Sequence, residues 1–454
     1  MKIIVAGCGK VGKTILRALS DEKHDIIAID NNTKVVDDIQ SSFDCLTYCG
    51  NVTDVRVLKE AGAENASIIF AVTESDETNM QACLIAKKMG TRHTVARIRE
   101  IHNNDETNIG FKKDLIGLSY IINPEFFTAQ SIYDILRLPF SSRVETFGQK
   151  RFELIEFTIE KNTYLDGLTI SKFKMEQERV LFGIVKRGTE TIIPNGAFKL
   201  KAGDILGILV SEHDKDEVFK KFELNVKPVK NVFIVGGSLT AYYLAKRLSQ
   251  KRIKTTIFEI DRDRAKELSL ILPNHVSVIC GNGLDKELLL EEGYRHCDAF
   301  INLTGLDEQN ILSSYVAQKD NIQTVVTKIN QPNLAQTARD LKIECIVSPQ
   351  DIVSSITKRY VRAHGHGLGS KIETLYSIID DTAVAVEIIV NNNVIYVDKR
   401  LRDLSLAPNT IVAGIIRNND TIIPNGDDQI LDGDRIIVIS TNKNISSLED
   451  VFVN

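Results

Sequence analysis

The 454-residue chain lacks the long apolar stretches and the excess of positive charge that mark two large classes of protein. Its longest apolar runs, residues 68–72 and 205–210, are strand-sized, far below the ~20 residues that a membrane-spanning helix needs. Lysine and arginine number 56 against 61 aspartate and glutamate residues, a net charge of −5. We therefore expect no membrane span, and nucleic acid is not expected as a main partner.

Cysteine pairs and catalytic signatures are also missing. The seven cysteines are an odd number without any C-x-x-C pair, which argues for a reducing compartment. The chain opens directly with a strand-like run and shows no signal-peptide pattern, so we expect a cytosolic protein. His364 and His366 have no Cys or carboxylate at ligand spacing. We therefore expect no metal site and assign no catalytic residue.

What the sequence does contain is an internal duplication. Thr-Ile-Ile-Pro-Asn-Gly occurs at residues 191–196 and again at 421–426. Cys-Gly-Asn at 49–51 recurs at 280–282, and Thr-x-x-Asp-Glu-x-Asn at 73–79 recurs at 304–310. Length alone suggests three domains of ~150 residues each. The repeats instead predict two copies of one unit of about 227 residues.

Each copy divides into two lobes with different patterns. Strands near residues 2–6, 25–30, 45–48, 67–72, 93–98 and 120–122 alternate with helical patterns, which predicts a parallel sheet built from βαβ units. Residues 150–225 and 370–452 carry mostly strand-like runs and predict small α+β lobes. The fold class is therefore α/β, with predicted domains at 1–140, 141–227, 228–368 and 369–454. Linkers are predicted at 140–150 and 363–370.

A helix should follow the sixth strand of each copy, at Asn123-Pro124 and at Ser348-Pro349. Asparagine or serine can cap such a helix, and proline suits its first turn. Apolar residues at 126, 129, 132, 133 and 136 form a stripe at helical spacing. Two interpretations fit this stripe: packing against the helix's own sheet, or contact with a partner lobe.

The clearest chemical motif is Gly-Cys-Gly-Lys-Val-Gly at residues 7–12, between a predicted strand and a helical pattern. Gly7 permits the tight turn, Gly9 lets the backbone approach a pyrophosphate, and Gly12 allows close packing of helix and strand. The helix N-terminus offers free amides and a positive dipole to phosphates. Asp30 can accept both ribose hydroxyls and would repel a 2′-phosphate, which favours NAD or an adenosine nucleotide over NADP.

Further residues follow the other strands of the predicted sheet: Asn51 and Val52, Thr73 and Glu74, and Arg97. The carboxyl ends of parallel strands meet at one edge, so these residues should converge on the same crevice. Arg97 could pair with a phosphate or another ribose-side anion. It could equally form a salt bridge with a carboxylate at the sheet end.

The second copy departs from this pattern. Ser238 replaces the middle glycine of the loop, and Ala241 takes the place of the third. Glu259 replaces the aspartate and Lys328 replaces the arginine. A side chain at Ser238 crowds the approach of a pyrophosphate. The second site is therefore expected to bind a different nucleotide, to bind weakly or to be vestigial.

A dehydrogenase would also need a substrate pocket and a general acid or base near the nicotinamide. The second half of the chain repeats the first, so it cannot be a separate substrate domain. The sequence therefore predicts binding rather than catalysis, and an NAD-dependent oxidoreductase remains the alternative from another class.

Together these residues resemble the RCK (KTN) family of regulatory domains. The resemblance rests on the glycine loop with Asp30, the segments at 49–54 and 73–79, Arg97, and the Ile-Pro-Asn-Gly and Gly-Asp sequences of the small lobes. It covers essentially the entire chain and implies two Rossmann-like RCK N-lobes, each followed by an α+β RCK C-lobe. Tandem RCK units in one chain resemble regulatory subunits of Trk-type potassium-uptake systems. Regulators of potassium efflux share the N-lobe and remain an alternative.

The resemblance implies a non-enzymatic cytoplasmic protein, peripheral on the inner face of the cell membrane. It implies a homotetrameric ring that binds NAD(H), or ATP and ADP, and gates a membrane potassium transporter. In the first N-lobe it implies ligand contacts at Gly7, Cys8, Gly9, Lys10, Val11, Gly12, Asp30, Asn51, Val52, Thr73, Glu74 and Arg97. In the second it implies contacts at Gly236, Gly237, Ser238, Leu239, Thr240, Glu259 and Thr304. It also favours the partner-lobe interpretation of the helix after the sixth strand.

Overall fold

The computed structural model describes residues 1–20, 23–99, 117–148, 150–173, 179–224, 228–343, 345–364, 371–379, 382–391, 396–443, 445 and 447–453. These residues form two compact units. Unit 1 comprises Met1–Leu136, here called N-lobe 1, and Val229–Lys358, N-lobe 2. Unit 2 comprises Arg137–Pro228, C-lobe 1, and Arg359–Asn454, C-lobe 2.

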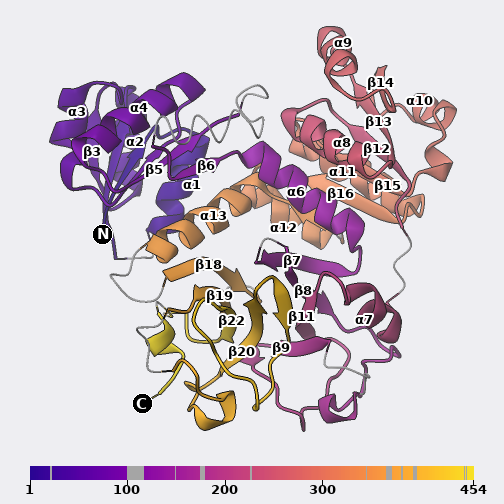
Figure 1. Cartoon of the computed structure of the whole chain (residues 1–454). Coiled ribbons are helices and arrows are strands. Elements are labelled where there is room, and N and C mark those ends of the chain that lie inside the picture. The colour runs from indigo at the N-terminus through magenta and orange to yellow at the C-terminus, as the bar shows by residue number, and fades with distance from the viewer. Residues whose placement is uncertain are drawn as a thin grey trace. The chain divides into compact units, whose positions relative to one another are not determined.

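Strands and helices alternate along both N-lobes (Figure 1). The elements of N-lobe 1 are β1 (Lys2–Ala6), α1 (Lys10–Leu19), β2 (Asp25–Asp30), α2 (Thr33–Ser42), β3 (Leu46–Cys49), α3 (Val55–Glu60), β4 (Ile68–Ala71), α4 (Asp76–Met89), β5 (His93–Arg97), β6 (Tyr120–Ile122) and α6 (Pro124–Arg137). Those of N-lobe 2 are β12 (Asn231–Val235), α8 (Leu239–Gln250), β13 (Lys254–Glu259), α9 (Arg262–Ile271), β14 (Val276–Cys280), α10 (Lys286–Glu291), β15 (Ala299–Asn302), α11 (Asp307–Lys319), β16 (Thr324–Lys328), α12 (Pro332–Asp340), β17 (Cys345–Val347) and α13 (Pro349–His364).

The two N-lobe sheets have the same topology. Their strand orders are β3-β2-β1-β4-β5-β6 and β14-β13-β12-β15-β16-β17, with parallel pairing throughout. The strand order reverses beside β1 and β12, which is where a ligand crevice forms in such sheets. Strands β1 and β4 are buried almost throughout, because helices cover both faces of a parallel sheet.

Helix α6 carries the contact between the two N-lobes. It begins as the sequence predicts, with the Asn123 Oδ1 accepting a hydrogen bond from the backbone N–H of Phe126 at 2.9 Å. Its buried face enters a hydrophobic core that belongs mainly to N-lobe 2. The residues that α6 contributes are Ala129, Ile132, Tyr133 and Leu136. The structure therefore supports the partner-lobe interpretation of this stripe.

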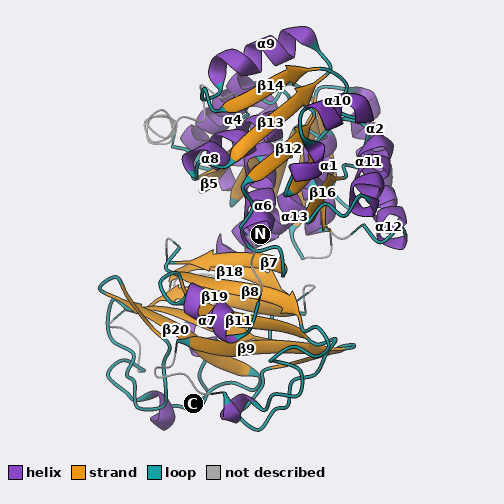
Figure 2. Cartoon of the chain, turned by 90° about the vertical axis from the view of Figure 1, so that its right-hand side faces the viewer, coloured by secondary structure: helices purple, strands orange, loops and turns teal. Residues whose placement is uncertain are grey.

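Unit 2 is dominated by strands, in contrast to unit 1 (Figure 2). C-lobe 1 contains β7 (Ser141–Phe147), β8 (Phe152–Thr158), β9 (Val180–Arg187), β10 (Glu190–Ile192), β11 (Ile205–Ser211) and α7 (Lys215–Lys221). C-lobe 2 contains β18 (Lys371–Ile378), β19 (Ala383–Ile389), β20 (Thr410–Arg417), β21 (Asp420–Ile422) and β22 (Arg435–Ser440). The sheet orders β10-β9-β11-β8-β7 and β21-β20-β22-β19-β18 are equivalent and antiparallel.

The C-lobe strands are apolar on both faces because each sheet packs on two sides. Leu209 of β11 enters a core that both C-lobes share, whereas Ile208 and Val210 of the same strand enter the core of C-lobe 1 alone. Side chains alternate between the faces of a strand, so burial on both faces produces a continuous apolar run. This explains the unbroken hydrophobic runs in the sequence.

The predicted linker at 140–150 is wrong. Strand β7 occupies most of it and pairs antiparallel with β8. Its pairing partner and the buried Phe147 stabilise it, and neither could be recognised from the local sequence. Of the second predicted linker, residues 363 and 364 end α13 and the remaining six lie outside the described residues.

The repeated Gly-Asp sequences have a structural role. Arg187 donates to both carboxylate oxygens of Asp204, at 2.7 and 2.6 Å. Arg417 donates to Asp434 in the same way, at 2.9 and 2.7 Å. Both aspartates are almost fully buried, and such two-point pairing satisfies a buried carboxylate. The repeats therefore preserve an internal ion pair of each C-lobe.

Candidate functional site

The first glycine loop follows β1 and leads into α1. Gly7 has a φ of +96°, and a Cβ there would lie 2.7 Å from the backbone nitrogen of Thr73. A Cβ at Gly12 would lie 2.0 Å from the Gly7 carbonyl oxygen. The fold itself therefore requires glycine at these two positions.

Gly9 is different, because nothing in the fold requires it to be glycine. Its φ of −68° and ψ of −160° are open to any residue. Apart from its chain neighbours, no atom of the described residues lies within 4 Å of the place a Cβ would take. Gly9 caps α1 without a side-chain hydrogen bond, which leaves first-turn amides available to another acceptor. Close approach of a ligand explains this glycine, whereas packing does not.

Asp30, at the end of β2, lies against the loop. Its Oδ2 accepts a hydrogen bond from the backbone N–H of Cys8 at 2.7 Å, and its Oδ1 accepts one from Asn32 at 2.9 Å. The Cys8 thiol is buried, with its Sγ 3.7 Å from the Ile29 carbonyl oxygen. Burial raises the pKa of this thiol to about 12, so it stays protonated near neutral pH. Cys8 therefore contributes its backbone N–H to the loop, where it binds Asp30, while its thiol is buried.

The repeated Thr-x-x-Asp-Glu-x-Asn segment fixes the strand ends beside each loop. In N-lobe 1 the Asn79 Oδ1 accepts hydrogen bonds from the backbone and the hydroxyl of Thr73, at 2.8 and 2.7 Å. The Asn79 amide donates to the Arg97 carbonyl at 2.9 Å. Asn310 binds Thr304 in the same way in N-lobe 2. The asparagine therefore positions two candidate ligand contacts, a role that the sequence analysis did not assign.

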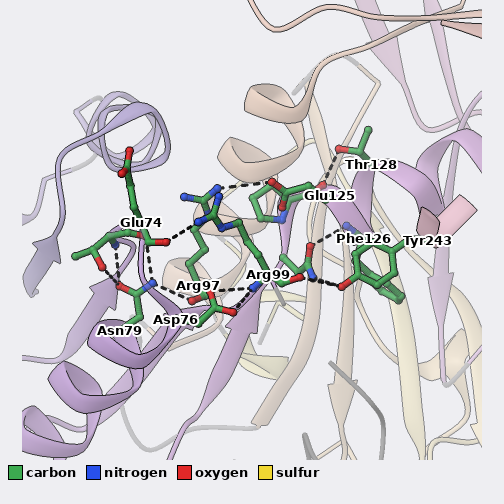
Figure 3. A network of polar contacts seen from close by, with 12 residues as sticks. Glu74, Asp76, Asn79, Arg97, Arg99, Glu125, Phe126, Thr128 and Tyr243 are labelled. Carbon is green, nitrogen blue, oxygen red and sulfur yellow. Dashed lines mark hydrogen bonds and ion pairs between the residues drawn. The ribbon is translucent and has the colours of Figure 1, made fainter. Parts of the chain in front are cut away.

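Three charged side chains lie close together near the end of β5 and the first turn of α6 (Figure 3). The Arg97 side chain, 13% exposed, lies with its Nη2 3.6 Å from the Glu125 Oε1 on the first turn of α6. Arg99 donates to the Glu74 carbonyl oxygen, and its backbone N–H donates to Asp76. Burial lowers the pKa of Arg97, while Glu125 acts in the opposite direction. The sheet-end salt bridge that the sequence left open is thus present in the structure.

The remaining predicted contacts of N-lobe 1 lie in varied surroundings. Lys10 and Glu74 are exposed and Val11 is half-buried. Asn51 is exposed, and its Oδ1 accepts from the backbone of its own turn. Val52 is buried in the hydrophobic core of N-lobe 1. The structure therefore brings the glycine loop, Asp30, Thr73 and Arg97 to one sheet edge, while the Val52 side chain belongs to the core.

In the second glycine loop, side chains of the protein bind several backbone groups of the loop and of the helix that follows it. Ser238 has a φ of −65° and a ψ of 169°, similar to Gly9, but its Oγ accepts a hydrogen bond from Ala241 and caps α8. Glu259 accepts from the backbone N–H of Gly237. The Arg264 Nε donates to the Gly237 carbonyl at 2.8 Å. The loop amides are therefore partly satisfied by the protein itself.

Lys328 takes the place of Arg97 in N-lobe 2. It is 8% exposed, and its Nζ donates to the Leu303 carbonyl at 3.0 Å. Burial lowers the pKa of Lys328, while Asp307 and Glu125 act in the opposite direction. Lys328 lines a cavity of about 230 Å³ whose other walls come from both N-lobes. These other residues are Pro124, Glu125, Thr128, Ser238, Leu239, Thr240, Asn330 and Pro349.

Two residues that connect the N-lobes are not among the site residues that the sequence predicts. The Tyr243 hydroxyl, on α8, donates to the Arg99 carbonyl at 3.1 Å and accepts from the Asn123 amide at 3.1 Å. Glu125 pairs with Arg97 and also lines the cavity of N-lobe 2. The cap at Asn123 could have drawn attention to Glu125, whereas no local signal marks Tyr243.

Neither a metal centre nor a membrane helix is found in the part of the chain that the structure describes. That part holds no cluster of three or more His, Cys, Asp or Glu side chains suited to a metal ion. None of its helices is long and apolar enough to cross a membrane. The His364 ring stacks on Tyr360, with 4.3 Å between ring centroids, and His366 lies outside the described residues.

Two known domain families match most of the chain. The TrkA-N domain profile matches residues 3–124 and 232–349, which lie within the two N-lobes. The TrkA-C domain profile matches residues 154–223 and 385–453, in the two C-lobes.

Curated relatives share the full length of the chain. The Trk system potassium uptake protein TrkA of Haemophilus influenzae is 30% identical over 461 residues, covering 100% of this chain and 98% of that protein. The Trk system potassium uptake protein TrkA homolog of Archaeoglobus fulgidus is 29% identical, with 100% of both chains covered.

Among solved structures, the GsuK channel bound to NAD matches with a TM-score of 0.65 at 16% identity, covering 98% of this chain and 77% of that one. The GsuK RCK domain matches with a TM-score of 0.64 at 16% identity, covering 98% and 93%. At this identity the likeness shows a shared fold.

Proposed function

Because this chain belongs to the TrkA family, we propose that it is a nucleotide-binding regulatory subunit that gates a membrane potassium-uptake transporter of the Trk type. The relatives carry the name of the Trk potassium uptake system, and two RCK-type repeats are present. Within the described residues the chain has no membrane-spanning helix of its own, so the ion pathway would belong to a separate partner.

The observation that carries nucleotide binding is Gly9. Open space in front of an unstrained glycine at a helix N-terminus fits a pyrophosphate that approaches the backbone closely. In this proposal the amides of residues 7–12 bind phosphates, and Asp30 accepts the ribose hydroxyls. Arg97 adds a phosphate contact, and Asn51, Val52, Thr73 and Glu74 border the base or ribose. We call this set site 1.

The ligand class of site 1 follows from its charges. The Asp30 carboxylate would repel a 2′-phosphate, which favours NAD(H), ATP or ADP over NADP. Site 2 comprises residues 236–240, Glu259, Thr304 and Lys328. The Ser238 side chain crowds the approach of a pyrophosphate to the backbone of the second glycine loop. Site 2 therefore binds nucleotide more weakly than site 1.

Gating follows from differential affinity. A nucleotide that binds one shape of the assembly more tightly shifts the equilibrium toward that shape, and by no more than this difference in affinity. We propose a homotetrameric ring on the inner face of the membrane as the assembly that transmits the shift to the transporter.

A flux experiment tests this function. The chain is reconstituted with its Trk-type transporter in liposomes, and potassium flux is measured with NADH, NAD, ATP and ADP in turn. We expect different fluxes with ATP and ADP, or with NADH and NAD. Calorimetry on the same preparation reports binding. Equal flux with all four ligands, despite confirmed binding, would contradict the proposal. Absorbance of NADH that falls with time would instead indicate an oxidoreductase.

A further inference from the structure

Glu125 lies between the two candidate sites of unit 1. Its Oε1 is 3.6 Å from the Arg97 Nη2, at the mouth of site 1 (Figure 3). The same residue lines the cavity of site 2, together with Lys328 and the first residues of α8. One carboxylate therefore faces a cation of each site.

The position of Glu125 is fixed from both sides. Asn123 caps the helix in front of it, and later α6 residues, from Ala129 to Leu136, contribute to the core of N-lobe 2. The Tyr243 hydroxyl binds both Asn123 and the Arg99 carbonyl, which ties α8 to the strand end that carries Arg97. These contacts fix the backbone of the first turn of α6, from which the Glu125 side chain reaches Arg97.

The ion pair at site 1 is incomplete. Among the described residues, neither the buried Oε2 of Glu125 nor the buried Nε of Arg97 has a hydrogen-bond partner. A well-formed pair of arginine and carboxylate normally makes two parallel hydrogen bonds. The guanidinium thus keeps donor capacity for a second anion, such as a phosphate.

Site 2 has a buried cation with an open side. Lys328 makes no ion pair with any described residue within 4 Å, and its Nζ donates to a carbonyl only. A buried ammonium without a close counterion favours an anion in the adjoining space. The Glu125 carboxylate, which lines the same cavity, works against the same anion.

Resting on the proposed function, we propose that Glu125 couples the two sites. Through this carboxylate, phosphate bound at site 1 weakens phosphate binding at site 2. A phosphate that binds the unused donors of Arg97 offsets the positive charge that otherwise compensates Glu125. The negative charge of Glu125, which lines the site 2 cavity, is then less compensated by Arg97 and repels a second phosphate there. Linkage requires the reverse effect to be equally large.

The coupling is measured by calorimetric titration of the full-length chain with ATP. The affinity of site 2 is obtained with site 1 occupied, and again in a Gly9→Ala/Asp30→Ala double variant, in which both expected losses of affinity combine to keep site 1 empty. We expect ATP to bind site 2 about tenfold more weakly when site 1 is occupied, within the usual range for coupled sites. With Glu125→Gln added to both forms of the chain, the ratio of these two site 2 dissociation constants should fall to about one.

Two controls accompany the titration. Glu64→Gln removes an exposed carboxylate of N-lobe 1 and should leave the ratio as in the unchanged chain. Adenosine has no phosphate, so it should bind the two sites of the unchanged chain independently, which tests the charge dependence without any substitution at Glu125.

The outcomes separate the two proposals. Binding of ATP at both sites with no coupling in the unchanged chain, or with equal coupling in Glu125→Gln, overturns the role of Glu125 and leaves the proposed function standing. Equal coupling with adenosine and with ATP would also overturn the role of Glu125 and leave the proposed function standing. Failure of every nucleotide to bind at any site overturns the proposed function and the coupling together.

Discussion

Gly9 and Ser238 occupy equivalent places in two copies of one lobe and have similar backbone angles, yet they leave different loops. At Gly9 the space in front of the backbone is open. At Ser238 a hydroxyl caps the protein's own helix. A single side chain therefore supplies an internal acceptor for one amide at the N-terminus of the second helix, whereas the first helix has no such side-chain acceptor.

The acids beside the loops allow the largest test of this comparison. Asp30→Ala should weaken NADH binding at site 1 by about hundredfold, because two hydrogen bonds to a charged group are lost. Glu259→Ala, its counterpart, should have a smaller effect on total binding because site 2 is the weaker site. Calorimetry with NADH measures both, and an unchanged affinity in Asp30→Ala would show that site 1 is misassigned.

A methyl group in the open space of the first loop is the second test. Gly9→Ala should lower nucleotide affinity about tenfold, because the pyrophosphate of the ligand can no longer approach the protein backbone as closely. Its melting temperature should stay level or rise slightly, since alanine fits this backbone and restricts the unfolded chain.

The matched control for this variant lies in the same loop. Gly12→Ala places a Cβ 2.0 Å from the Gly7 carbonyl, so it should destabilise the fold by about 2 kcal/mol. Thermal melting without ligand distinguishes the two glycines. Equal loss of stability in both variants would contradict a ligand-based reason for Gly9.

Opening the second loop is the smallest test. Ser238→Gly removes the cap and should raise nucleotide affinity at site 2 about threefold in the Gly9→Ala/Asp30→Ala background, where site 1 contributes little binding. The fold should lose only a few tenths of a kcal/mol, as is usual when glycine replaces a serine cap. A titration with NADH measures the change, and lower affinity would show that the cap itself supports the ligand.

Local signals predicted much of this molecule and failed at identifiable places. The strand that ends at Ala6, the loop of residues 7–12 and Asp30 were read from spacing, because tight turns and helix starts have few solutions. Strand β7 was mistaken for a linker because its stability comes from pairing with β8. Glu125 and Tyr243 were missed because their partners lie in other elements or in the other N-lobe.

The sequence by itself determined the duplication, the alternation of strand and helix in the N-lobes, and the loss of the middle glycine in the second copy. Periodicity and glycine geometry are properties of short segments, so they can be read without a structure. Only the tertiary structure decided that α6 packs into N-lobe 2 and that Glu125 faces both Arg97 and Lys328. Electrostatic contacts depend on distances between segments far apart in the chain, and folding alone sets those distances.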